Sequence, residues 1–500
     1  MEIPSSRRTI GGGIEENILA ILDASEARDS QDAIDDSIAF LDAVRAASIV
    51  PESGRPPTNK MWEAVFQILR VGKSLELIMA SFQLLNELDK RYPRVYSSNS
   101  NKSKSSSNAP PELVVVKEAW SPFFPGLGTS ISEREAAGKN SGGPLDSSSF
   151  QLLIQDLAEV NRKANFQTLD TKSHEDMDAY LVVSFLECKW ISVLNPIITS
   201  ISLECQNSLG SMLLFQYLVN FLEGDILPRN SVHEETLNWT FLRESLLNML
   251  LGSRKLNYKG LVRDCLAIMC GLSQIQSAFS NNKIYPENSV AKPPDNCDTA
   301  VAIALPEIGK KTCIAMQKLL ILIMELDISK KKAEMQGYTT RADGVRTPLV
   351  EVILDELTYN SEILSPFLQV FNEPKWKLEI ILQYFWKYTA KPSIRTRRSN
   401  GSSDDATFSG ALKCFSSSTS TKGIIKKIGI EVIQLLLAHG FKAHLFLSTE
   451  QCPALGISDC KEDVSGNSLV EAHGGFVIWK GSTVYSSNNT LYKVIGACSH

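Results

Sequence analysis

Histidine is scarce in this sequence, and the motifs that usually carry catalysis or hold a metal are missing from it. Six histidines occur among 500 residues, and none belongs to an H-E-x-x-H zinc motif. The ten cysteines include no C-x-x-C pair, and no G-x-S-x-G nucleophile elbow occurs. These absences exclude the common zinc and serine-hydrolase sites. We therefore expect a protein that is not an enzyme, with no cofactor, no metal and no small-molecule substrate.

Long hydrophobic runs are also missing. The nearest approach is Leu181–Leu203, which is interrupted by Glu187, Lys189 and Pro196, whereas a membrane-spanning helix needs about 20 nearly unbroken apolar residues. The first 13 residues contain no apolar core of the kind found in secretory signals. We expect no membrane association, and a location in the cytosol or the nucleus.

Charge of one sign is not in excess either. The formal net charge is -5, which argues against coating nucleic acid through overall charge. Hydrophobic residues make up 43% of the chain, enough for a sizeable core. Cys265 and Cys270 lie in an apolar helical run without two further zinc ligands, so core packing is the favoured interpretation of this pair.

Gly72-Lys73-Ser74 is the one suggestion of a phosphate-binding loop. The motif needs a glycine five positions before the second glycine, and Gln67 occupies that position. A break between two helices explains the glycine better. Thr58 is a suitable N-cap for the first of these helices.

Apolar residues recur at helical spacing through most of the chain. Trp62, Val65, Phe66 and Leu69 fall at i, i+3, i+4 and i+7, the pattern of an amphipathic helix. Leu319–Met324 is apolar on every side, which predicts burial. Strand-like alternation occurs only near residues 475–484, and no fixed-period repeat is present. The fold class expected is all-α, an irregular armadillo- or HEAT-like helical solenoid or bundle with disordered linkers.

Shifts in composition divide the chain into helical segments and linkers. The expected divisions are an N-terminal helical segment 1–96, a mostly disordered linker 97–149, a middle helical segment 150–277, a linker 278–298, a central helical segment 299–390, a basic and Ser/Thr-rich linker 391–423, a C-terminal helical segment 424–472 and a tail 473–500.

Two basic clusters have several possible roles. The first comprises Lys387, Lys391, Arg395, Arg397 and Arg398, with no acidic residue between them. Its possible roles are a nuclear import signal or a contact with an acidic partner, a contact with a phosphate backbone, or an ordinary solvated linker. We take Lys391, Arg395, Arg397 and Arg398 as the candidate import or acidic-partner contact. The second cluster comprises Lys422, Lys426 and Lys427, and it has the same alternatives.

Several long strings of residues resemble the plant family of negative regulators of systemic acquired resistance. These strings are unusual, and together they extend over most of the chain outside the linkers. They include Arg55–Met61, Lys117–Phe123, Arg341–Pro348, Leu354–Tyr359 and Pro374–Glu379.

The resemblance implies a nuclear, armadillo-like protein without a catalytic site that represses defence-gene expression. It also implies a role in the DNA damage response and in recombination, as a subunit of the five-six type structural maintenance of chromosomes (SMC) complex. The partners expected are SMC-complex subunits, including a second non-SMC subunit, with chromatin or DNA contacted indirectly. The alternative hypothesis is a direct DNA-binding transcriptional repressor.

Polar residues within the family-like strings are the candidate interaction surface. They are Asp343, Arg346, Lys375 and Lys377, and helix capping and turn formation are their alternative roles. Two segments depart from the family pattern. Residues 181–208 resemble an insertion, and the tail 473–500 becomes rich in glycine and β-forming residues where the family continues in helix.

Overall fold

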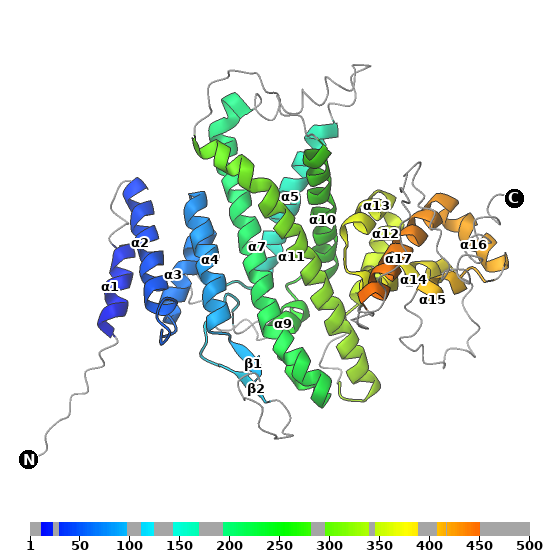
Figure 1. The fold of residues 1–500 in the computed structure, drawn as a ribbon, viewed down its shortest axis with the longest axis horizontal. Coiled ribbons are helices and arrows are strands. Elements are labelled where there is room, and N and C mark those ends of the chain that lie inside the picture. The colour runs from blue at the N-terminus through cyan, green and yellow to red at the C-terminus, as the bar shows by residue number, and fades with distance from the viewer. Residues whose placement is uncertain are drawn as a thin grey trace, which may run out of the picture. The chain divides into compact units, whose positions relative to one another are not determined.

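Sixteen helices and one two-stranded sheet make up the described part of the chain (Figure 1). The structure is a computed structural model that describes residues 12–23, 30–97, 112–124, 144–169, 194–281, 296–339, 346–388, 408–416 and 418–450. It divides into two units, Met1–Ile353 and Leu354–His500. The prediction of an all-α helical solenoid or bundle is confirmed.

The first unit is organised around one long helix, α7 (Leu194–Thr236). Helices α3, α4, α5 and α11 all pack against it, and Figure 1 shows α7 with α4 on one side and α11 on the other. The other helices of this unit are α1 (Gly12–Asp23), α2 (Ser30–Ser48), α3 (Asn59–Val71), α4 (Leu75–Arg91), α5 (Ser147–Leu169), α8 (Trp239–Arg243), α9 (Leu246–Gly252), α10 (Tyr258–Asn281) and α11 (Asn296–Met335). Helix α12 (Leu349–Tyr359) crosses the boundary between the units.

The predicted break between α3 and α4 is present, and each helix begins with a capping side chain. The Thr58 hydroxyl accepts a hydrogen bond from Met61 N, and the Ser74 hydroxyl accepts one from Leu77 N. Such caps satisfy backbone N–H groups that have no partner within the helix. Gly72 closes α3 through its N–H to Ile68 O at 2.9 Å. Gly72-Lys73-Ser74 is therefore a helix break.

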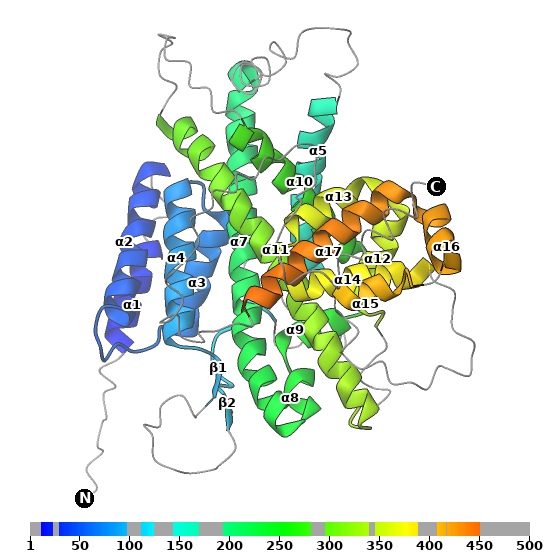
Figure 2. The same cartoon turned by 45° about the vertical axis from the view of Figure 1, so that its right-hand side comes forward.

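The second strand of a short hairpin and an aromatic contact lie inside the range expected to be a linker, 97–149. Strands β1 (Val95–Ser97) and β2 (Leu113–Val115) are antiparallel, and β1 contacts α7 (Figure 2). Trp120 stacks on Trp62 of α3 with ring centroids 5.3 Å apart, and Phe123 is fully buried. Residues 112–124 are thus packed, because their aromatic side chains fill a space between helices. Residues 98–111 and 125–143 lie outside the described ranges.

Helix α7 begins earlier than the sequence pattern indicated. The pattern placed a helix from Met212, after an apparent insertion at 181–208, whereas α7 begins at Leu194. Residues 181–193 of that segment, and the whole tail 473–500 with its strand-like run, lie outside the described residues.

The second unit is built on α14 and α17. Helix α14 (Pro374–Tyr388) packs against α15, α16 and α17. The other helices are α13 (Ser361–Val370), α15 (Phe408–Lys413), α16 (Ser418–Ile428) and α17 (Ile430–Glu450). Helices α15 and α16 both begin within the range 391–423, where a linker was expected. Their buried residues, among them Phe408 and Thr421, explain why this stretch folds.

Gly429 divides a stretch that the sequence pattern treated as one helix, 424–439. Its φ of +82° is a conformation that glycine adopts without steric cost. Its N–H donates to Ile425 O at 2.9 Å, which ends α16 and allows α17 to begin. Helix α17 is long and apolar enough to cross a membrane by length and composition alone. Ile433 and Leu436 of this helix are buried in the second unit, whereas Leu445 and Phe446 are exposed.

Candidate interaction surface

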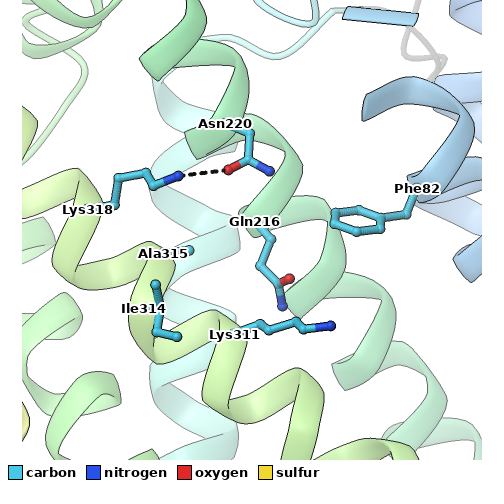
Figure 3. Close-up of a pocket in the computed structure, with 7 residues that line it drawn as sticks. All are labelled: Phe82, Gln216, Asn220, Lys311, Ile314, Ala315 and Lys318. Carbon is cyan, nitrogen blue, oxygen red and sulfur yellow. Dashed lines mark hydrogen bonds between the residues drawn. The ribbon is translucent and has the colours of Figure 1, made fainter. Parts of the chain in front are cut away.

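A groove lies on the first unit where α4, α7 and α11 meet (Figure 3). Its cavity volume is about 220 Å³, below the roughly 300–1,000 Å³ of small-molecule sites. The groove is lined by Phe82, Gln216, Asn220, Lys311, Ile314, Ala315 and Lys318. The groove is therefore smaller than most sites that bind small molecules.

Gln216 fixes α7 to α11 at the floor of the groove. Its side chain is buried, and its amide Nε2 donates to Ile308 O at 3.1 Å and to Thr312 Oγ1 at 2.9 Å. Thr312 Oγ1 itself donates to Ile308 O at 2.8 Å. Because both hydrogens of the buried amide are used, this contact holds the two helices at a defined register.

A second polar network joins all three helices. Asn220 Nδ2 on α7 donates to Asn86 Oδ1 on α4 at 3.0 Å, and Asn220 Oδ1 accepts from Lys318 Nζ on α11 at 3.3 Å. Lys318 also pairs with Glu223 Oε2 at 2.6 Å. The groove is therefore a rigid feature, held from its floor by hydrogen bonds between helices.

The walls of the groove combine apolar and basic side chains. Ile314 is 52% exposed, and Phe82 of α4 faces the groove from the opposite wall (Figure 3). Lys311 pairs with Glu307 at 3.7 Å, but both side chains are more than half exposed, so this ion pair contributes little. An apolar patch with basic neighbours suits a protein contact.

Several ionisable groups are buried elsewhere among the described residues of the first unit. Burial raises the pKa of Asp89 to about 8, while the neighbouring Tyr217 hydroxyl acts in the opposite direction. Burial also raises the pKa of the Cys265 thiol and takes that of Cys270 to about 12. Thiols so strongly protonated are poor nucleophiles. Within the described residues, no group of three or more His, Cys, Asp or Glu side chains is placed to hold a metal.

Comparison with known proteins decides the family. The model of the SNI1 middle domain matches residues 94–195 and 197–373, and the model of the SNI1 C-terminal domain matches residues 389–478. The negative regulator of systemic acquired resistance SNI1 of Arabidopsis thaliana is 43% identical over 440 residues, which cover 88% of this chain and 84% of that protein.

The chain belongs to the SNI1 family of negative regulators of systemic acquired resistance. No solved structure matches it. Most of the groove, on α7 and α11, falls within the range of the SNI1 middle domain, whereas Phe82 on α4 precedes that range.

Arg346, one of the predicted contact residues, points inward within the SNI1 middle domain. Its guanidinium pairs with Asp327 of α11 and lies over the Tyr258 ring, 5.1 Å from the centroid. Asp327 Oδ2 also accepts from Leu349 N at 2.8 Å, where a carboxylate is favoured by the N-terminus of α12. Arg346 therefore fixes the start of α12, and only 15% of its side chain is exposed.

Replacing Arg346 with alanine should lower the free energy of unfolding of the first unit by about 2 kcal/mol, since it removes a mostly buried ion pair and a cation–π contact. Hydrogen exchange in the first turn of α12 measures the effect. The Asp327 carboxylate accepts the hydrogen bond from Leu349 N, and in the variant this carboxylate no longer has Arg346 as its counter-charge. Lys331→Ala, an exposed position on the same helix as Asp327, is the matched control. Equal protection in both variants would contradict the assigned role.

Lys377 is also buried, whereas Lys375 is exposed. Lys377 Nζ donates to Leu368 O at 2.9 Å within the second unit, and its residue is only 7% exposed. The Lys377 ammonium group thus lies against the last turn of α13, whereas the expectation for this residue was a place on a contact surface. Lys375 Nζ lies 5.7 Å from the centroid of the Trp376 ring and remains accessible.

The remaining predicted contact residues divide between described and undescribed parts of the chain. Asp343, Lys391, Arg395, Arg397 and Arg398 lie outside the described residues. Lys387 pairs with Asp355 at 3.0 Å. The second basic cluster, Lys422, Lys426 and Lys427, is exposed on α16.

The sequence reasoning missed the groove residues of α11, of which Ile314 is the most exposed. The apolar run Leu319–Met324 was expected to be buried, and it is buried apart from the half-buried Ile321. The missed signal is the recurrence of isoleucine every seven residues, at 314, 321 and 328.

Proposed function

We propose that this SNI1-family chain is a non-enzymatic helical scaffold subunit of a nuclear SMC-type chromosome maintenance complex. In this role it acts in the DNA damage response and in recombination, and it restrains systemic acquired resistance and defence-gene expression. The observation that carries the proposal is the rigid groove of α4, α7 and α11, with exposed Ile314 beside basic side chains. Scaffold proteins built of stacked helices use such surfaces to bind other proteins.

Family and fold favour binding over catalysis. The relative from Arabidopsis thaliana is named for negative regulation, and the described ionisable groups form no catalytic constellation. A protein that restrains transcription without chemistry of its own must act through partners. The proposal implies that the chain is located in the nucleus. It also implies that SMC subunits and a second non-SMC subunit are its direct partners.

The alternative is direct DNA binding by the second unit. The exposed lysines of α16, Lys422, Lys426 and Lys427, are the feature that favours it, because lysines bind phosphates as point charges. Affinity for duplex DNA that falls steeply with salt in the purified chain, and is lost on charge reversal of these lysines, would support this alternative over the scaffold.

Affinity purification of the tagged full-length chain from nuclear extract tests the scaffold. We expect mass spectrometry to find SMC subunits and one non-SMC subunit among the retained proteins. Nuclease treatment of the extract serves as the control, since it removes proteins that are retained only through shared DNA. Retention of no SMC component by a helical, folded preparation would refute the proposal.

A further inference from the structure

An apolar stripe runs along the outer face of α11. Ile314 is 52% exposed, Ile328 38% and Met335 73%, and Ile321 between them is half-buried. Single exposed apolar residues are common on protein surfaces, but these four follow one another at intervals of seven residues. Residues seven apart on an α-helix are offset by about 20° around its axis, so the four side chains form a stripe that turns by about 60° between Ile314 and Met335.

The stripe is bounded by buried residues on both sides. Ala315 and Leu322 on one side and Met324 on the other are buried, because α11 packs against α7 and α10. Only a narrow face of α11 thus reaches solvent. The seam along which one helix packs against another has apolar residues at two positions of each heptad, and this stripe supplies one of the two.

The groove described above continues this stripe towards α7. Ile314 belongs to both the groove and the stripe. Leu227 of α7 is 47% exposed. It lies one helical turn after Glu223, which pairs with Lys318 of α11, so it is on the face of α7 that contacts α11. Apolar side chains of an added helix could therefore contact α11 along its length and enter the groove at one end.

Basic residues flank the stripe at the same spacing. Lys311, Lys318 and Lys332 share a line with Glu325 beside the isoleucines, and Lys310 and Lys331 are exposed nearby. Lys318 is paired with Glu223, and Lys311 makes only an exposed pair with Glu307, so Lys310, Lys311, Lys331 and Lys332 supply the accessible positive charge. In coiled coils the charged residues beside the seam select the partner. A predominantly positive border selects a helix with acidic flanks.

We propose that an amphipathic helix of an acidic partner protein docks lengthwise on α11. Its apolar residues contact Ile314, Ile321, Ile328 and Met335, and its acidic residues face the flanking lysines. This proposal rests on the proposed scaffold function and specifies the surface through which that function acts.

Photo-crosslinking tests the occupant of the stripe. In the tagged full-length chain, a benzophenone amino acid replaces Ile321 or Ile328, and each variant is irradiated in nuclear extract. The control carries the same amino acid in place of Leu152 on α5, which is 56% exposed. We expect positions 321 and 328 to cross-link to two sites about seven residues apart in one acidic, heptad-patterned segment of another protein. Cross-links to another segment of this chain, to a second copy of it, or at no higher yield than from position 152 would overturn the proposal.

Two pairs of substitutions measure the strength of the contact. Ile321→Asp with Ile328→Asp should reduce recovery of the cross-linked partner by about tenfold or more. Leu152→Asp with Val160→Asp, both exposed on α5, should leave recovery within about twofold. Ile321 is half-buried, so its replacement could also disturb folding. The second test is therefore Lys311→Glu with Lys332→Glu, which alters only exposed charges and should also weaken recovery of the partner severalfold. Unchanged recovery would overturn the proposal that the partner is acidic.

Failure of the docking proposal and of the scaffold function are distinguishable. If the wild-type chain retains SMC subunits and the α11 variants retain them equally, the scaffold stands and the docking surface is overturned. If the wild-type chain retains no SMC subunit but cross-links from α11 to an acidic helical segment of another nuclear protein, the docking surface stands and the SMC assignment is overturned.

Discussion

Asp225→Ala is expected to lower the free energy of unfolding of the first unit by about 3–5 kcal/mol, the range for breaking a buried ion pair by removing one partner. Asp225 pairs with Arg229 one turn later on α7, at 3.4 Å, and their side chains are 1% and 3% exposed. Alanine leaves the Arg229 charge buried without a counter-ion. The cost of that unpaired charge accounts for most of the expected loss.

The same ion pair holds the α8–α9 turn against α7. Asp225 Oδ2 accepts from Leu246 N at 2.8 Å, in the first turn of α9, and Arg229 Nη1 donates to Phe241 O at 3.0 Å. Both backbone groups lose their partners if the pair rearranges. Local opening of α8 and α9 should therefore accompany the loss of stability.

A third charged side chain adds to the effect. Burial lowers the pKa of Arg94, and the Asp225 carboxylate opposes that decrease, whereas Arg229 reinforces it. The Nε and Nη1 groups of Arg94 are buried and make no hydrogen bond. Removing Asp225 thus leaves two arginines close together without their shared counter-charge.

The control replaces the pair as a whole. Asp225→Leu with Arg229→Met removes both charges of the pair at similar volume and should cost clearly less than Asp225→Ala, because Arg94 alone, and not two arginines, then lacks the Asp225 charge. Urea unfolding gives the overall loss, and hydrogen exchange in α8 and α9 gives the local one. A single variant no less stable than the double variant would show that the pair contributes no such coupling.

The helices of this chain could be predicted because their signals are local. Thr58, Ser74 and the stripe of Trp62 and Phe66 specify where α3 and α4 begin and which face is buried. Trp120 carries no such signal, since its partners Trp62 and Phe221 are distant in the sequence and meet it only through the fold. For this reason the range 97–149 was expected to be a linker, whereas residues 112–124 within it are packed against helices.

The candidate surface was less predictable than the fold, for a related reason. Polarity marked Arg346 and Lys377 as surface residues, but only the tertiary structure shows the carboxylate and the carbonyl that draw them inward. Conversely, apolar character alone does not show that Ile314 and Ile328 are exposed. Their exposure depends on which faces of α11 are covered by α7 and α10, and the spacing along α11 alone does not determine that.

Lys377→Met should change how the stability of the second unit depends on pH. Burial, and then the charge of Lys442, lower the pKa of Lys377 to about 8 from 10.5, whereas in the unfolded chain it keeps its ordinary value. Between these two values the unfolded chain binds more protons than the folded one, so the contribution of Lys377 to stability increases with pH. Below about pH 8 the buried ammonium costs roughly 3 kcal/mol, which is relieved as pH rises towards 10.5.

The variant should therefore be more stable than the wild type near pH 7 and lose that advantage by about pH 10. The gain at pH 7 is expected to be about 1–2 kcal/mol, because methionine removes the cost of the charge but leaves Leu368 O without its donor. Hydrogen exchange on peptides from α14 and α17 measures this difference in stability at several pH values above 7.5. His439 is neutral in this range, because burial and the charges of Lys377 and Lys442 lower its pKa.

Lys375→Met is the matched control, two residues away on the same helix and exposed. It should leave the stability and its pH dependence nearly unchanged, because its side chain is exposed to solvent. If Lys377→Met instead lowers stability equally at every pH, then the hydrogen bond to Leu368 outweighs the cost of burying the charge. Lys377 would then stabilise the end of α13 in its charged form, and the depressed pKa would have to be abandoned.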